Sequence, residues 1–118
     1  MRNIIIVIAA LMLNSTFVLA SDKPLTSPDK VAAGEKLFAT NCSTCHGPQG
    51  KGDGPAAMAF NPKPRNLQTE PFKGGTEDAK IFATISNGLT GSNMPGFAQL
   101  NETDRWNLAF FVKLLRKN

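Results

Sequence analysis

The sequence predicts an all-α domain in which three main helices surround a long irregular loop. Three segments combine a capping residue with apolar residues at helical spacing, at 27–42, 76–88 and 101–118. Between the first two lies a stretch rich in glycine and proline, residues 47–75, without the alternation of a strand. One helical turn is expected inside this loop, at AAMAF. We therefore expect one helical domain without β-sheet.

The N-terminal residues 1–20 are expected to be an export signal. The positive charge of Arg2 precedes the apolar run IIIVIAALML, and Val18 and Ala20 are the small residues before a cleavage site. This run is shorter than the roughly 20 residues that a spanning helix needs. We expect cleavage after Ala20, a domain at 21–118 and a location in a bacterial periplasm. The alternative is an uncleaved segment that anchors the domain to the membrane.

The first helix is expected to begin after Ser27, a suitable N-cap, with Pro28 at the first helical position. Val31, Gly34 and Phe38 follow at steps of three and four residues, so they share one face. A glycine inside a helix costs about 1 kcal/mol relative to alanine. Gly34 therefore predicts a close crossing with another helix.

The other two helices carry similar signals. Thr76 is a candidate N-cap for the second helix, Ile81 and Ile85 lie on one face, and Gly88 supplies the stop. Asn101 is the expected N-cap of the last helix. The apolar face of that helix is formed by Leu108, Phe111, Val112 and Leu115.

Charge and size limit the function and the source of stability. The formal net charge is +4 at pH 7 with no block of like charges, which does not indicate nucleic-acid binding. A domain this small commonly needs a disulfide, metal or cofactor beside its core. The chain has 2 cysteines, close together in NCSTC, and a bridge between them would close a very small loop and stabilise little. We therefore expect a bound group to complete the core.

The segment NCSTCHGPQG holds Cys42, Cys45 and His46, which are both cysteines and the only histidine. Structural zinc needs four ligands, and the chain has no further Cys or His. A thioredoxin-like disulfide requires a neighbouring βαβ pattern, which is missing. C-x-x-C-H is also the attachment motif of c-type haem. The two thiols would form thioethers with the haem vinyl groups, and His46 would be the proximal iron ligand.

No other histidine is present for the second axial position, and the chain after the expected cleavage site has two methionines as candidates, Met58 and Met94. Met58 lies in the apolar segment AAMAF, where a methionine commonly fills a gap in the core. Met94 lies in GSNMPGF, an irregular loop before Pro95 that can present its sulfur to a ligand. We predict Met94 as the distal iron ligand. His/Met ligation raises the reduction potential and leaves no open position, which favours electron transfer.

The chain resembles class I c-type cytochromes over most of residues 27–117. The resemblance lies in GEKLFATNCSTCHGPQGKGDG, ISNGLTGSNMPGF and the aromatic-rich last helix. It implies the small cytochrome c fold, with three main helices and a long loop wrapped around one covalent haem c. It also implies that the first and last helices cross, with Gly34 and Phe38 meeting Phe111.

The resemblance implies two further site residues. In the family a proline carbonyl accepts a hydrogen bond from the proximal imidazole, and Pro55 is the candidate here. Arg65 is a candidate partner for a haem propionate, the alternative being a solvated loop arginine.

The function implied is that of a periplasmic protein that carries single electrons and is not an enzyme. It is expected to be a monomer. It would dock transiently with redox partners such as a quinol-oxidising complex, a dehydrogenase, a terminal oxidase or a reductase. A dedicated haem c subunit of a periplasmic dehydrogenase, oxidase or reductase complex is the alternative. An enzyme or gas sensor in which Met94 leaves the iron also stays open.

Overall fold

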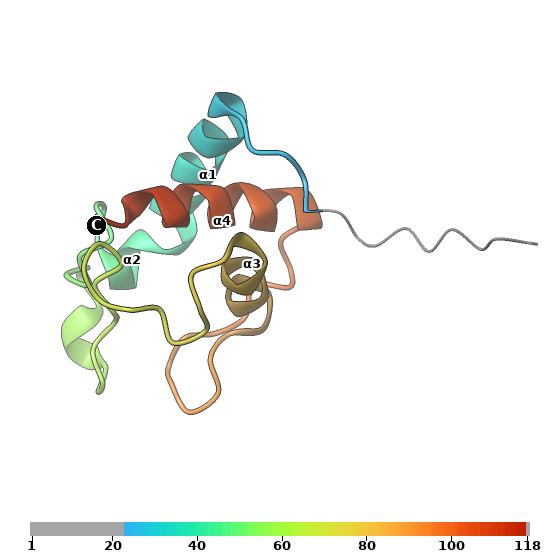
Figure 1. Cartoon of the computed structure of the whole chain (residues 1–118). Coiled ribbons are helices and arrows are strands. Elements are labelled where there is room, and N and C mark those ends of the chain that lie inside the picture. The colour runs from blue at the N-terminus through green and yellow to red at the C-terminus, as the bar shows by residue number, and fades with distance from the viewer. Residues whose placement is uncertain (1–22, 118) are drawn as a thin grey trace, which may run out of the picture.

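The computed structural model describes residues 23–117, in which every regular element is a helix (Figure 1). Its elements are α1 (Pro28–Asn41), α2 (Ser43–His46), the 3₁₀ turn η1 (Ala57–Ala59), α3 (Asp78–Asn87) and α4 (Glu102–Leu115). No strand occurs in the described range, and the predicted all-α class with three main helices is confirmed. The turn expected at AAMAF is also present, as η1. The predicted signal segment, residues 1–20, lies outside the described residues.

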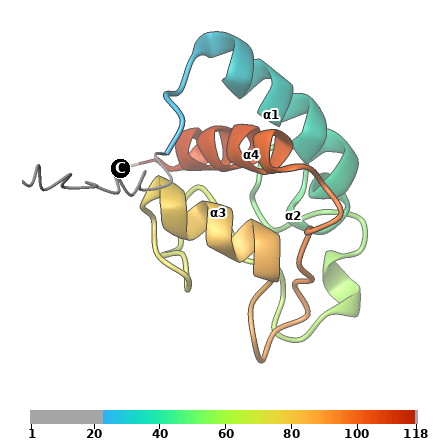
Figure 2. The same cartoon turned by 90° about the vertical axis from the view of Figure 1, so that its right-hand side faces the viewer.

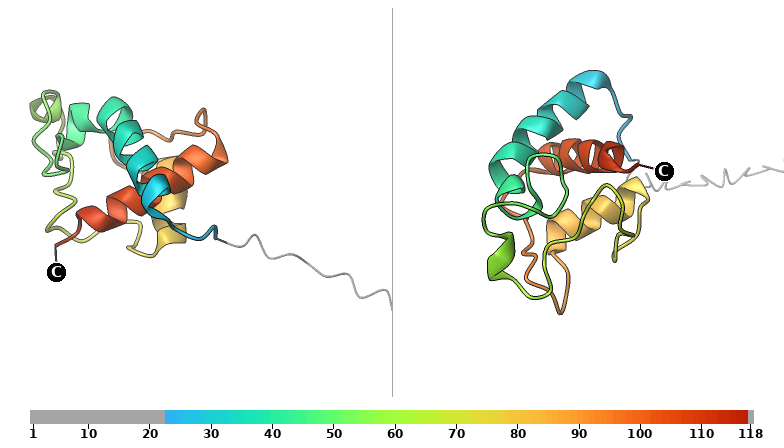
Figure 3. Two further views of the ribbon diagram at one scale, coloured as in Figure 1. Left: turned by 90° about the horizontal axis from the view of Figure 1, so that it is seen from above. Right: turned by 90° about the vertical axis from the view of Figure 1, so that its left-hand side faces the viewer.

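Helices α1 and α4 cross at Gly34, as predicted (Figure 3). A Cβ atom at Gly34 would lie 2.0 Å from the carbonyl oxygen of Asn107 and 2.9 Å from Cβ of Phe111. Beside the crossing, the rings of Phe38 and Phe111 pack at 5.3 Å between centroids. Only a residue without a side chain allows α1 to approach α4 this closely, which explains the glycine inside the helix.

Helix α3 packs against α4 from the other side (Figure 2). Ile81 and Ile85 are buried there, as their spacing predicts. Phe82 stacks on Trp106 with ring centroids 4.2 Å apart. Leu108 of α4 is fully buried in the hydrophobic core. The apolar faces read from the sequence therefore meet in one core around α4.

The capping predictions hold at two helices and fail at one. The Ser27 hydroxyl accepts from the N–H of Lys30, and the Asn101 side chain accepts from the N–H of Asp104 at 2.8 Å. The prediction of Thr76 as N-cap is wrong, because α3 begins one residue later with Glu77 at the N-cap and no side-chain cap bond. The first turn of α3 instead carries a long-range ion cluster.

This cluster centres on Asp78 at the start of α3. Its carboxylate pairs with Lys23 of the N-terminal segment and with Lys113 of α4, the latter at 3.0 Å. Burial raises the pKa of Asp78, but hydrogen bonds from the two lysines outweigh burial and lower the pKa below its ordinary value of 3.8. The charged carboxylate therefore ties three segments together.

The connections between helices lie on one side of the α1–α4 pair (Figures 1 and 3). Residues 47–77 form a long loop interrupted only by η1, as the glycine and proline content predicts. Helix α3 ends at Gly88 with φ +72°, the stop expected there, and residues 88–101 form the second loop. Within residues 23–117, no helix is long and apolar enough to cross a membrane.

Candidate haem-binding site

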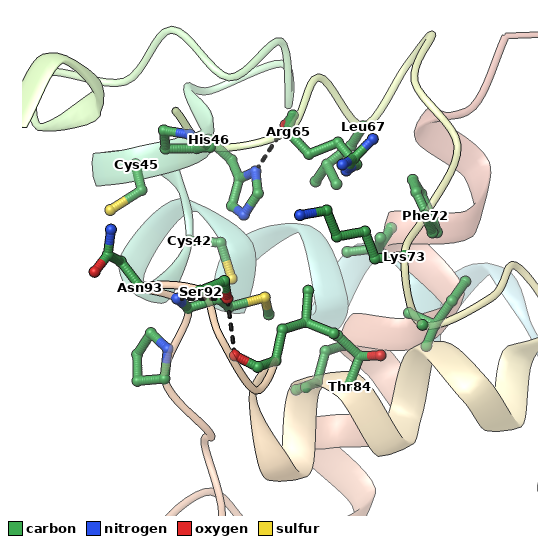
Figure 4. Close-up of a pocket in the computed structure, with 18 of the residues that line it drawn as sticks. Cys42, Cys45, His46, Arg65, Leu67, Phe72, Lys73, Thr84, Ser92 and Asn93 are labelled. Carbon is green, nitrogen blue, oxygen red and sulfur yellow. Dashed lines mark hydrogen bonds between the residues drawn. The ribbon is translucent and has the colours of Figure 1, made fainter. Parts of the chain in front are cut away.

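A cavity of about 260 Å³ lies between α2, the two loops and the core (Figure 4). Cys42, Cys45, His46 and Met94 all line it, so the structure brings together the four residues that the sequence singled out. Met58 does not line it and is 79% exposed. The apolar wall includes Phe38, Leu67, Phe72, Ile81, Ile85 and Val112. Of the two candidate methionines, Met94 is therefore the one that the fold brings to this cavity.

The two thiols lie at the start of the short helix α2 and inside it. Cys42 lies in the break between α1 and α2, and Cys45 lies within α2, both facing Ser92 and Asn93 across the cavity (Figure 4). Burial, together with the neighbouring Cys45, raises the pKa of Cys42 to about 12. Cys42 is therefore a neutral thiol near pH 7, unlike the low-pKa thiolate of a C-x-x-C disulfide oxidoreductase.

His46 ends α2 and has its imidazole fixed by a backbone carbonyl. Its Nδ1 lies 3.0 Å from the carbonyl oxygen of Arg65 (Figure 4). A carbonyl can only accept, so Nδ1 carries the proton and Nε2 keeps its lone pair for a metal. Burial lowers the pKa of His46, and the hydrogen bond to Arg65 opposes that effect. The ring is therefore neutral and held in one orientation.

The prediction that Pro55 supplies this carbonyl is wrong. Pro55 is exposed, and the carbonyl that the His46 imidazole meets comes from a later return of the chain, at Arg65. The return depends on Gly52, at φ +78°, where a Cβ atom would lie 2.5 Å from the carbonyl oxygen of Pro64. Because any backbone carbonyl can accept this bond, the side chain of Arg65 gives no sequence signal for it.

Met94 is presented by a loop that closes on itself. The Met94 N–H donates to the Ser92 hydroxyl at 3.2 Å, and that hydroxyl donates to the Leu89 carbonyl at 2.9 Å. The Leu89 N–H donates back to the Met94 carbonyl at 3.3 Å. Further along, the Phe97 N–H donates to the Ile85 carbonyl at 2.8 Å and fixes the loop to α3.

The set of donors in the cavity suits haem better than a simple metal ion. Among the residues that the structure describes, no group of three or more His, Cys, Asp or Glu side chains could hold a metal ion. The cavity instead combines an apolar wall with two thiols, one imidazole and one thioether. Two thiols suit covalent attachment, and an imidazole with a thioether suits the axial positions of a haem iron. The residues present therefore fit haem c.

Arg65 also contributes its side chain to the cavity wall. Its guanidinium lies 3.9 Å from the carboxylate of Glu70, with 30% of the Arg65 side chain exposed. The structure therefore gives this arginine a protein partner. Its role toward a haem propionate stays a prediction.

Comparison with known proteins gives consistent matches. The family model for cytochrome c matches residues 31–116. The Cbb3-type cytochrome c oxidase subunit CcoP of Rubrivivax gelatinosus is 41% identical over 71 residues, covering 60% of this chain and 20% of the relative. The Cbb3-type cytochrome c oxidase subunit FixP of Bradyrhizobium sp. (strain ORS 278) is 32% identical over 84 residues, covering 71% of this chain and 27% of the relative. The chain thus spans about a quarter or less of these relatives.

A solved structure extends the likeness to three dimensions. A chain of the Kuenenia stuttgartiensis reducing HAO-like protein complex superposes with a TM-score of 0.75 at 31% sequence identity. The match covers 82% of this chain and 48% of that one. Sequence motif, fold and cavity therefore agree with the family match, and the chain belongs to the cytochrome c family, with covalently bound haem c as its cofactor.

Proposed function

We propose that this protein carries single electrons on one haem c, with His46 and Met94 as axial ligands. The observation that carries the proposal is the shared cavity, in which Cys42, Cys45, His46 and Met94 meet. Cys42 and Cys45 form the two thioether links. When bound, the haem iron supplies a one-electron couple between its ferric and ferrous states.

The residues around the cavity keep the site suited to electron transfer. The Arg65 carbonyl fixes the His46 ring with Nε2 free for the iron. The hydrogen bonds of the Met94 loop hold the thioether in the cavity wall. With protein ligands on both faces, no position is left for a substrate or gas molecule. The protein is thus a carrier and not itself an enzyme.

The partners are redox proteins that donate or accept one electron, such as a quinol-oxidising complex, a dehydrogenase, a terminal oxidase or a reductase. The domain at 21–118 acts as a periplasmic monomer after cleavage behind Ala20, without stable membrane insertion. N-terminal sequencing of exported protein tests the cleavage, since an anchored carrier would retain residues 1–20. Sedimentation of the purified protein tests the monomer.

A dedicated haem subunit of an oxidoreductase complex is the second candidate. It is favoured by relatives whose names place them in cytochrome c oxidases and by the solved chain from a HAO-like complex. Stable co-purification with a catalytic subunit from the native host would select this role. Recovery of the free protein alone would select the mobile carrier.

The decisive experiment is purification after co-expression with a haem c maturation system. We expect the mass of the protein to increase by one haem that survives denaturation, a reversible one-electron titration, and a ferrous form that does not readily bind carbon monoxide. The double variant Cys42→Ser/Cys45→Ser should lose the covalent haem. Haem that dissociates on denaturation of the wild type would contradict covalent attachment. Ready binding of carbon monoxide by the wild type would contradict the carrier and favour a sensor or enzyme.

A further inference from the structure

One peptide group connects the proximal histidine to the carboxylate of Glu70, a residue that also lines the cavity. The carbonyl of Arg65 accepts from His46 Nδ1 at 3.0 Å. The N–H of the same peptide group, contributed by Asn66, donates to Oε2 of Glu70 at 3.0 Å. We infer that Glu70 acts through this peptide group as a positioning residue for His46 and lowers the reduction potential of the haem. The inference rests on the proposed ligation by His46.

The turn that carries this peptide group is closed by its own hydrogen bonds. The Gln68 N–H donates to Oδ1 of Asn66 at 2.9 Å, and the Glu70 N–H donates to the Asn66 carbonyl at 3.0 Å. These bonds place the Glu70 side chain over the Asn66 N–H. The Arg65 guanidinium lies 3.9 Å from the same carboxylate oxygen and adds a weak ion pair.

Contacts with other segments hold the turn against the site. The Leu67 N–H donates to the Gly50 carbonyl at 2.6 Å, and the Gln68 side chain donates to the Gln49 carbonyl at 2.8 Å. The N–H of Lys117, beyond α4, donates to the Gln68 carbonyl at 2.9 Å. The turn is therefore anchored both to the loop after His46 and to the C-terminal segment. Its peptide group cannot rotate without breaking several bonds.

When two hydrogen bonds share one peptide group, a carboxylate in the first bond strengthens the second. Hydrogen bonds in series polarise one another, and a bond to an ionised group is about twice as strong as a neutral one. An acceptor on the N–H of the peptide group makes its carbonyl oxygen more negative. That oxygen then draws the Nδ1 proton more strongly, which makes the imidazole a more basic ligand. A more basic ligand favours ferric iron and so lowers the potential.

The charge of Glu70 can also act on the haem directly through space, because Glu70 lines the cavity. The Glu70 side chain is 52% exposed, so solvent and salt screen its field. The hydrogen-bonded path runs through a single peptide group and is screened much less. The two effects can be separated with a second exposed carboxylate that is not bonded to this peptide group.

The test compares Glu70→Gln with Asp53→Asn in the holoprotein. Glutamine keeps the size of the side chain and an oxygen that can accept from Asn66, but it removes the charge. Asp53 provides the matched control because its carboxylate lies beside Gly47, next to His46, where a glycine Cβ would be 2.0 Å from its Oδ1. The measured quantities are the reduction potential and the proton NMR shift of the His46 Nδ1–H in the ferrous protein.

We expect Glu70→Gln to raise the potential by the equivalent of about a two- to fivefold change in the equilibrium constant for reduction. The Nδ1–H resonance should move upfield as its hydrogen bond weakens, and Asp53→Asn should change both quantities less. A shift no larger than that of Asp53→Asn, or an unmoved Nδ1–H resonance, would overturn the inference. Failure of the proposed function is distinguishable, because a wild type without covalent haem would give neither measurement.

Discussion

The substitution Gly34→Ala tests the helix crossing that supports the haem site. The added Cβ would lie 2.0 Å from the Asn107 carbonyl oxygen, whereas ordinary contacts begin at 3.4 Å, so the helices must separate or shift. Overpacking typically costs about 1–3 kcal/mol, and a clash with backbone atoms belongs at the upper end, about 3 kcal/mol, since buried side chains such as Phe38 also lose contacts as the gap opens. Alanine recovers about 1 kcal/mol of helix propensity. We expect a net loss of about 2 kcal/mol.

The assay is urea denaturation of the holoprotein followed by circular dichroism, supported by thermal melting. For a domain of this size, a loss of about 2 kcal/mol lowers Tm by about 10 °C. Ala32→Gly is the matched control on the exposed side of α1, and it should cost only the propensity term of about 1 kcal/mol. A Gly34→Ala protein as stable as the wild type would refute the close crossing.

Three further predictions concern the ion cluster, a helix cap and the loop after His46. Asp78→Asn should lose about 1 kcal/mol of unfolding free energy at pH 7, a modest figure because Lys23 and Lys113 are about half exposed. The pKa of Asp78 is lower in the folded protein, so the stability that Asp78 contributes is present above pH 3.8 and is lost as the pH falls through the folded pKa. Urea denaturation at a series of pH values should therefore show the stabilities of the variant and the wild type converging in acid. Asn101→Ala should cost about 1 kcal/mol in urea denaturation, and Asn101→Asp, which keeps the capping oxygen, should retain most of the stability. Gly52→Ala should destabilise the protein by more than 1 kcal/mol, because φ is +78° at this position and the methyl group has no space. The NMR resonances of the His46 imidazole should also broaden, and an unchanged spectrum would show that the loop tolerates a side chain.

The sequence predicts those features that depend on neighbouring residues. Ser27 and Asn101 act as caps because each side chain needs only the first turn of its own helix. The stripe of Ile81 and Ile85 is buried because helical spacing alone puts both residues on one face. Gly34 indicates the helix crossing because glycine is costly in a helix unless something requires it.

Features that depend on distant contacts were not predictable in the same way. Thr76 had the right chemistry for a cap, but α3 begins at Asp78, whose carboxylate pairs with Lys23 and Lys113 of distant segments. The carbonyl that orients His46 belongs to Arg65 because of how the loop folds back. A backbone oxygen has no residue type, so no motif marks it. The C-x-x-C-H motif identified the haem, and tertiary structure supplied its surroundings.

The most direct test of the account is a redox titration of the wild type, Met94→Ala and Met58→Ala. Met94 lines the cavity with His46, whereas Met58 is 79% exposed on η1. We expect that loss of the thioether in Met94→Ala lowers the reduction potential and that Met58→Ala retains the wild-type value. A wild-type potential in Met94→Ala, or a lowered potential in Met58→Ala alone, would contradict the proposed ligation.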